Sequence, residues 1–304
     1  MKDKFDYTTS QLFNFTPDSY LERTSRPIYA LVFLLPFIVF YEIGTIFINT
    51  DVLDQSQVRV VAFVWLQNLL EYIGAGSRLA WAAPPLAVVV ILTALQLVSR
   101  KRWYFGINDI WPMAIECILL AAPLIVLSLL LSSPAQPKGD IVRQNYSAAQ
   151  TQSHAIPGCS LVAVVGLSST AADTTGSTLK GKFLLADIIT GIGAGIYEEL
   201  IFRLILICVL MLLFQDILRF SHNNSIILSV LVSAALFSAH HHIVFVNGQL
   251  SASAPFNWTE FGFRTVAGIY FAVLFAIRGF AITAGTHTFY DIIATVINTV
   301  FFPQ

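Results

Sequence analysis

The sequence has little charge for its length. Only 12% of its 304 residues are charged, whereas 56% are hydrophobic. Soluble domains carry about twice this charged fraction. The composition therefore excludes an ordinary soluble domain and predicts a multi-pass membrane protein surrounded by a lipid bilayer. The formal net charge of −1 provides no excess of basic residues for phosphate contacts, which argues against nucleic acid as a partner.

Cysteine and targeting signals are also scarce. The three cysteines, Cys117, Cys159 and Cys208, do not have the spacing of metal ligands, and two of them lie in apolar runs. We therefore expect packing roles for Cys117 and Cys208 and no disulfide framework. The first 20 residues are polar and lack the apolar core of a signal peptide, so a cleavable leader is not expected.

Apolar runs long enough to cross a membrane recur along the chain. A transmembrane helix needs roughly 20 apolar residues. We expect such helices at 28–48, 79–98, 111–132, 183–197, 225–246, 264–282 and 284–302, and a further apolar helix at 203–218. The segment 58–76 contains several polar residues, so it either crosses the membrane or lies at its interface. The predicted fold is an all-α polytopic bundle of about seven or eight transmembrane helices.

The polar segments divide the chain into four parts. Residues 1–27 are predicted to be a polar N-terminal tail, and residues 28–132 a first group of transmembrane helices. Residues 133–182 are rich in Ser, Thr, Gln, Ala and Gly, and we expect an extramembrane loop there. Residues 183–303 form the remaining bundle, and every chemically distinctive motif lies in that bundle.

The first of these motifs is GAGIYEELIFR, residues 193–203. Glu199 and Arg203 are four residues apart in the order that favours a salt bridge on a helix. Glu198 points about 100° away from its neighbour, so one arginine does not easily pair with both acids. Gly191 and Gly195 have GxxxG spacing, which allows another helix to approach closely and to fix the position of Glu198.

Two further motifs place titratable groups on other apolar helices. Phe237 and His241 share one helix face at four-residue spacing, and so do His287 and Asp291. Each motif alone has a structural reading: a salt bridge, a histidine triplet at a wet helix end, or a hydrogen-bonded helix contact. Their joint presence in one apolar region favours a functional site. Other acids within spans, such as Glu42 and Glu116, are expected to be helix contacts.

A carboxylate in a poorly solvated pocket becomes a better proton acceptor near neutral pH. If these motifs converge, Glu198 is able to take a proton from a water that attacks a carbonyl, and histidine N–H groups are able to stabilise the oxyanion. No Ser or Cys nucleophile accompanies the histidines. The pattern therefore indicates hydrolysis of a peptide bond by activated water.

The three motifs also resemble a known family, the CPBP intramembrane proteases, which include the type II CAAX prenyl endopeptidases and bacteriocin-processing proteins. The resemblance covers about residues 183–300 and rests on EExxxR, FxxxH and HxxxN/D, which are Glu198, Glu199 and Arg203, Phe237 and His241, and His287 and Asp291. It implies that Glu198 activates the water with help from His241, and that His287 and Asp291 form the oxyanion site. Glu199, Arg203 and Phe237 are then supporting residues.

Asp291 departs from the prenyl endopeptidases, which have Asn at this position. An ionised Asp does not donate a hydrogen bond, so this residue is either protonated, a partner that orients His287, or a ligand. We expect no cofactor, since HExxH is absent. Zinc is the alternative, and its ligands would then be Glu198, His241, His287 and Asp291.

The predicted function is therefore an intramembrane endopeptidase in a bacterial cytoplasmic membrane. Its expected partners are membrane-tethered or lipidated protein substrates. Two other readings remain open: a proton-coupled transporter, because buried Glu and His also form proton relays, and a non-catalytic scaffold of the same fold. A transporter is often built from inverted repeats, and no repeat is visible in the sequence.

Overall fold

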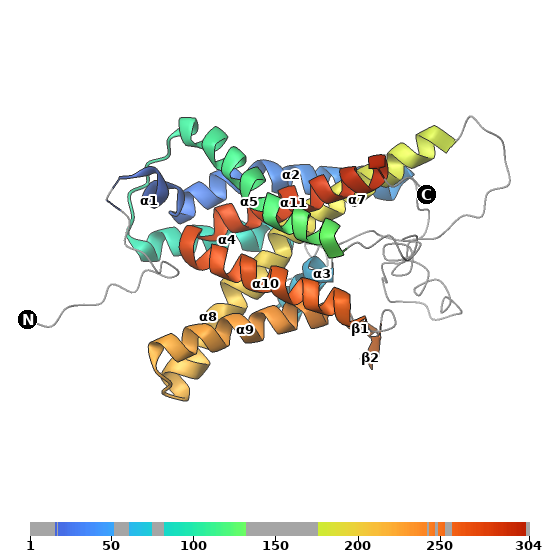
Figure 1. Cartoon of the computed structure of the whole chain (residues 1–304). Coiled ribbons are helices and arrows are strands. Elements are labelled where there is room, and N and C mark those ends of the chain that lie inside the picture. Colours follow the sequence, from blue (N-terminus) through green and yellow to red (C-terminus); the bar gives the residue numbers. More distant parts are fainter. Residues whose placement is uncertain are drawn as a thin grey trace, which may run out of the picture.

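The computed structural model describes residues 16, 18–51, 61–74, 82–131, 176–241, 243–246, 249–252 and 257–301. Within these ranges, six helices are long and apolar enough to cross a membrane. They are Pro27–Ile48, Ile107–Leu131, Leu184–Ile217, His222–His240, Trp258–Arg278 and Phe280–Thr299. The predicted all-α polytopic fold is confirmed, and the protein is a multi-pass membrane protein (Figure 1).

The N-terminal half supplies a short helix and a group of apolar helices. In chain order these are α1 (Tyr20–Thr24), α2 (Pro27–Asp51), α3 (Val61–Ile73), α4 (Ala83–Ser99), the 3-10 turn η2 (Ile107–Asp109) and α5 (Ile110–Leu131). The predicted segment 58–76 contains α3, whose 13 residues span only about 20 Å. That length is shorter than the hydrocarbon layer of a bilayer.

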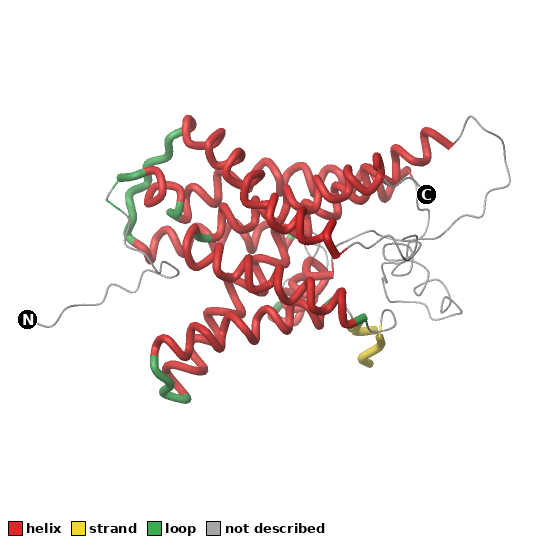
Figure 2. Tube along the Cα trace, in the orientation of Figure 1, coloured by secondary structure: helices red, strands yellow, loops and turns green. Residues whose placement is uncertain are grey.

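The C-terminal half contains the remaining helices and one hairpin. Its elements are α7 (Gly176–Glu199), the π-helical η3 (Leu200–Ile205), α8 (Leu206–Met211), the π-helical η4 (Leu212–Ile217), α9 (His222–His240), β1 (Ile243–Val246), β2 (Gln249–Ala252), α10 (Trp258–Arg278) and α11 (Phe280–Phe301). The two strands are antiparallel, with Ile243 opposite Ala252. Figure 2 shows the two strands in yellow; the other regular elements among the described residues are helices joined by loops.

Three expected boundaries were wrong. The segments 183–197 and 203–218 are one uninterrupted span, Leu184–Ile217, because π turns join them without a break in the helix. The expected span 79–98 is the shorter helix α4, Ala83–Ser99. The expected span 225–246 stops at His240, and its last residues form β1 instead. Six long helices and two shorter apolar ones therefore correspond to the seven or eight that we expected.

One boundary of each predicted polar segment also differs from the prediction. Residues 176–182, expected in the loop, belong to the first turns of α7. Residues 20–24, expected in a tail, form α1. The remainder of the predicted loop 133–182, including Cys159, and the first 15 residues lie outside the described part of the chain.

Close contact between α7 and α11 depends on the predicted GxxxG pair. A Cβ atom added at Gly191 would lie 2.7 Å from Asp291 Cβ, and one added at Gly195 would lie 2.5 Å from the backbone nitrogen of Thr288. The expected close approach of another helix is confirmed. It brings His287 and Asp291 of α11 alongside the acidic end of α7. Helix α2 also packs against α7.

Gly195→Leu is expected to destabilise the protein by about 3 kcal/mol or more, because over-packing at a backbone contact forces α7 and α11 apart. Denaturation in detergent micelles measures this effect. Gly262 is the matched control, since a Cβ there would meet nothing within 4 Å. Equal losses for Gly195→Leu and Gly262→Leu would contradict the proposed helix contact.

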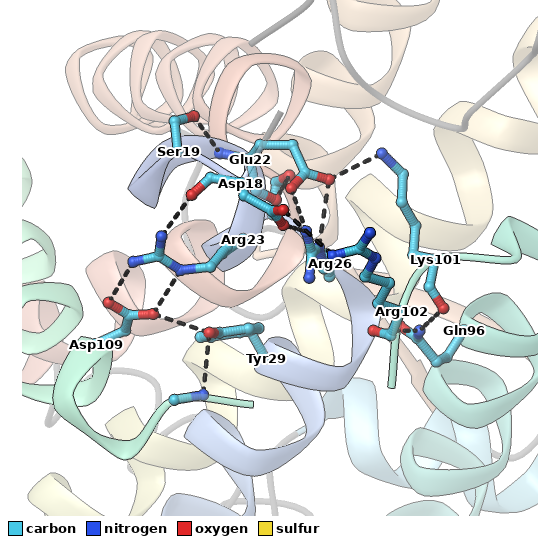
Figure 3. A network of polar contacts seen from close by, with 12 residues as sticks. Asp18, Ser19, Glu22, Arg23, Arg26, Tyr29, Gln96, Lys101, Arg102 and Asp109 are labelled. Atoms are coloured by element: carbon cyan, nitrogen blue, oxygen red, sulfur yellow. Dashed lines mark hydrogen bonds and ion pairs between the residues drawn. The ribbon is translucent and has the colours of Figure 1, made fainter. Parts of the chain in front are cut away.

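A network of charges fastens α1 to the connection between α4 and α5 (Figure 3). Lys101 Nζ lies 3.0 Å from Glu22 Oε1, and Glu22 also pairs with Arg26. Arg23 contacts both carboxylate oxygens of Asp109, at 2.9 and 3.0 Å. These residues hold α1, which precedes the first span, against residues 101–109, which are distant in the sequence.

The network predicts acid-sensitive stability. Burial alone favours the neutral form of Glu22, but hydrogen bonds from Arg26 and Lys101 outweigh burial and lower the pKa of its carboxyl group. A carboxyl whose folded-state pKa is lowered stabilises the fold above its ordinary pKa of about 4.3, and this stabilisation is lost as the pH falls through the lowered value. Glu22→Gln is therefore expected to cost about 2 kcal/mol at pH 7 and much less at pH 3.

Thermal unfolding between pH 3 and pH 7 measures this difference. Asp216→Asn, at an exposed acid, is the matched control and is expected to change stability little at any pH. A loss for Glu22→Gln that stays constant across the range would contradict the assignment.

Candidate active site

Glu198 and Glu199 lie at the end of α7, where the α-helix gives way to the π-helical turns of η3. Arg203 lies within η3. Glu198 is 5% exposed, and Glu199 and Arg203 are fully buried. π turns are rare and frequently occur at functional sites. Here they directly follow Glu199, and the span continues to Ile217.

The ion pair predicted from spacing is present. Arg203 Nε lies 3.1 Å from Glu199 Oε2. The guanidinium carbon lies 4.1 Å from the ring centroid of Phe237 on α9, and Nη2 donates to the carbonyl of Gly268 on α10 at 3.4 Å. A buried charge pair of this kind is tolerated only when its geometry and hydrogen bonds are good. Arg203 therefore ties Glu199 to two neighbouring helices.

His287, on α11, lies between two carboxylates. Its Nδ1 donates to Glu199 Oε1 at 2.7 Å, and its Nε2 lies 3.5 Å from Asp291 Oδ2. The imidazole stacks on Phe271 of α10, with 4.6 Å between ring centroids and 19° between planes. The acid on α7, the acid on α11 and the ring on α10 thus fix its orientation together.

His241 approaches Glu198 from the end of α9. Its Nδ1 donates to the carbonyl of Phe237 at 2.9 Å, and its Nε2 lies 3.8 Å from Glu198 Oε2. A distance of 3.8 Å is too long for a direct hydrogen bond. Phe237 therefore positions two site residues at once, His241 through its carbonyl group and Arg203 through its ring.

The structure brings all seven predicted site residues together in two linked groups. Glu199 anchors the first group, which contains Arg203, Phe237, His287 and Asp291. Glu198 and His241 form the second group. Glu198 and Glu199 are adjacent in the chain. The fixed position of Glu199 therefore also fixes the backbone position from which the Glu198 side chain extends.

His240 is a site residue that the sequence did not single out. Its ring centroid lies 4.9 Å from that of Trp65 on α3 and 5.3 Å from that of Phe202 on η3. The only signal in the sequence was the histidine triplet 240–242. The FxxxH spacing selected His241 from this triplet and gave no signal for His240, and His242 lies outside the described residues.

The four predicted zinc ligands do not form a single cluster. Among the described residues, one group of three ligating side chains lies within reach of a single ion: Glu198, His240 and His241, with ligand atoms within 4.8 Å of one another. His287 is bound to Glu199 instead. One carboxylate and two imidazoles match the donors of a catalytic zinc site. If zinc binds, these three residues would hold it, and zinc would supply polarisation of a bound water.

Two other acids in the spans have helix-contact partners, as expected. Tyr197 donates to Glu42 Oε1 at 3.3 Å, which joins α7 to α2. Glu116 accepts hydrogen bonds from Arg278 and from Tyr20, the latter at 2.8 Å. The thiol of buried Cys117 donates to a backbone carbonyl at 3.6 Å, in agreement with a packing role.

The fold and the site define a class of protein: a multi-pass helical membrane protein that buries acids, histidines and an arginine between its C-terminal helices. Residues 180–293 match the family model of type II CAAX prenyl endopeptidase Rce1-like proteins. This segment is therefore similar to Rce1-like proteins, which confirms the resemblance for residues 180–293, and it contains all seven predicted site residues. The similarity of this segment supports a CAAX-type intramembrane protease at the family level. No curated protein and no solved structure matches the chain.

Proposed function

We propose that the protein is an intramembrane endopeptidase that cleaves membrane-tethered, lipidated proteins near the C-terminus with a water activated by Glu198. The observation that carries this proposal is the different surroundings of the two adjacent acids. Glu199 is held by Arg203 and His287. Glu198 Oε2 is buried, makes no direct hydrogen bond among the described residues and lies 3.8 Å from His241 Nε2, so it is placed to accept a proton.

In the proposed reaction, Glu198 takes a proton from the water as the water oxygen forms a bond to the scissile carbonyl carbon. The carbonyl oxygen becomes an oxyanion, which the imidazole of His287 stabilises through its Nε2–H. The intermediate then collapses: the C–N bond breaks, and Glu198 returns the proton to the leaving amine. The reaction consumes one water and needs no other reagent.

Asp291 is best explained as the residue that orients His287. Its Oδ2 lies 3.5 Å from His287 Nε2, and its Cβ packs over Gly191. Because Nδ1–H is donated to Glu199, an Nε2–H requires the protonated imidazolium form of His287, which the carboxylates of Glu199 and Asp291 stabilise. The Nε2–H is then shared between Asp291 and an incoming carbonyl oxygen. This interpretation removes the need for Asp291 itself to donate a hydrogen bond.

A reconstituted system tests the substrate class. Purified protein in liposomes is incubated with a peptide that ends in a CAAX sequence, either farnesylated on its cysteine or unmodified, and mass spectrometry follows the release of a C-terminal fragment. We expect cleavage of the farnesylated peptide only. Cleavage of other lipidated peptides but not of the prenylated one would overturn the prenyl preference. A substrate moved across the membrane without cleavage would favour a carrier.

A further inference from the structure

Arg264 is a charged side chain of α10 that lacks a direct partner. The side chain is half-buried. Among the described residues it forms no hydrogen bond and no close ion pair, and acids act on its charge only at longer range. Glu260, four residues earlier, attracts it but accepts a hydrogen bond from Asn257. A partly buried charge of this kind is costly, and within a membrane span it indicates a function.

Helix geometry turns Arg264 toward the candidate active site. Gly268 and Phe271 lie four and seven residues further along α10 and share its face. The carbonyl of Gly268 accepts a hydrogen bond from Arg203 at 3.4 Å, and the ring of Phe271 stacks on His287. The α10 face that carries Arg264 is therefore the face that contacts the site.

A purely structural explanation is that Arg264 extends along its helix to the membrane interface. Long cationic side chains near helix ends often do so, and α10 begins at Trp258, roughly 9 Å away along the axis. However, the exposed side of α10 is a different one. Val266, about 200° further round the helix, is 50% exposed. Arg264 instead lies on the side that is packed against other helices.

The charge of Arg264 acts on site residues from three other elements. Each of these elements contributes at least one group of the two adjacent clusters described above, and the interactions reach both clusters. The site residues concerned are Glu198 at the end of α7, His240 and His241 at the end of α9, and Asp291 on α11. Arg264 thus places a positive charge beside the residues assigned to catalysis.

A peptide that is cut near its C-terminus brings a free carboxylate into this region. Like charges repel, so the acids Glu198, Glu199 and Asp291 oppose its entry. Arg203 does not compensate for them, because it is already paired with Glu199. A guanidinium group binds a carboxylate through two parallel N–H···O bonds. Arg264 has these donors unused.

We propose that Arg264 is a specificity-determining residue, which binds the free C-terminal carboxylate of the substrate. The inference rests on the proposed function, because it concerns the chain end that the cleavage releases. Each extended residue adds about 3.4 Å to a peptide. A carboxylate anchored on α10 therefore fixes how many residues separate the chain end from the bond beside Glu198.

The test uses one farnesylated peptide in two forms, with a free C-terminal carboxylate and with a C-terminal amide, in the liposome assay. For the wild-type protein we expect a KM about 10- to 100-fold lower for the carboxylate form, as charge-assisted hydrogen bonds supply. Arg264→Gln is expected to raise the KM of the carboxylate form at least to that of the amide. Its kcat, and its KM for the amide, are expected to stay at the wild-type values.

Two further variants make the comparison specific. Arg264→Lys keeps the charge and is expected to retain part of the preference, because an ammonium group does not form two parallel bonds. Arg219→Met, at an exposed arginine outside the site, is expected to retain all of it. A preference for the carboxylate form that is the same in wild type and Arg264→Gln would overturn the inference.

Other outcomes separate this inference from the proposed function. Equal KM values for the two peptides with wild-type protein would overturn the inference and leave the protease assignment intact, even if Arg264→Gln fails to fold. A kcat that falls equally on both peptides in Arg264→Gln would also overturn it and would place Arg264 at the oxyanion. If wild-type protein cleaves neither peptide, the proposed function fails, and tryptophan fluorescence then compares their binding. Tighter binding of the carboxylate form would support the inference, and equal binding would refute it.

Discussion

Glu198→Gln is expected to lower kcat by about 10⁴-fold while the protein remains folded, because the amide keeps the size of the side chain but cannot accept the proton of the water. KM is expected to change little, since Glu198 interacts with the water rather than with the substrate chain. Initial rates on the lipidated peptide in liposomes measure the loss. Equal recovery of folded protein from membranes verifies that stability is not the cause.

Two further substitutions make this experiment specific. Asp216→Asn also neutralises one acid, but at an exposed position outside the site, and full activity is expected. Glu199→Gln is expected to lower the yield of folded protein, because it removes the partner of buried Arg203. A Glu198→Gln protein that retains more than a tenth of wild-type activity would exclude Glu198 as the base.

Arg203→Met is expected to have the largest effect on stability, a loss of about 3–5 kcal/mol in the free energy of unfolding, since it removes the arginine partner of the buried Glu199 carboxylate. Arg203 is fully buried and contacts Glu199, Gly268 and the ring of Phe237. Arg203→Lys is expected to recover only part of this loss, because an ammonium group does not reproduce the planar stacking on Phe237. Unfolding in mixed micelles measures the differences.

A double-mutant cycle with Glu199 separates charge pairing from packing. Glu199→Gln combined with Arg203→Met removes both charges and is expected to be more stable than Arg203→Met alone. The exposed Arg219 provides the matched control Arg219→Met, with an expected change within about 0.5 kcal/mol. Additive losses in the double mutant would show that Glu199 and Arg203 are not energetically coupled.

The parts of the site that the sequence predicted are those governed by local spacing. Four-residue separation placed Glu199 beside Arg203, and the same spacing placed His287 near Asp291, because a helix brings such positions onto one face. GxxxG at Gly191 and Gly195 predicted the close helix contact for the same reason. The meeting of α7, α9 and α11 was inferred from the chemical content of their motifs and not from spacing.

The parts that the sequence did not predict depend on contacts between distant elements. The π turns after Glu199 join two expected helices into one, and a hydrophobic pattern does not distinguish π from α turns over such short stretches. The position of His240 depends on Trp65 and Phe202, which lie on other elements. The hydrogen bond from Tyr197 to Glu42 likewise joins two helices that are far apart in sequence.

Two statements stay predictions: that the protein resides in a bacterial cytoplasmic membrane, and that it needs no cofactor. Substrate selection by residues 133–182 or by the N-terminal tail is a hypothesis, since most of each segment lies outside the described residues. Deletion of either segment, followed by comparison of cleaved peptides, tests it. Unchanged selectivity after a deletion would exclude the deleted segment as a selector.

The most direct test of the central claim is quantitative profiling of protein termini in matched membranes that contain either wild-type protein or Glu198→Ala at equal abundance. Wild-type membranes are expected to contain new C-termini on lipidated proteins that are absent with Glu198→Ala, and these termini would identify both the substrate and the bond. Identical profiles for two equally folded proteins would contradict the assignment of Glu198 as the base of an intramembrane protease.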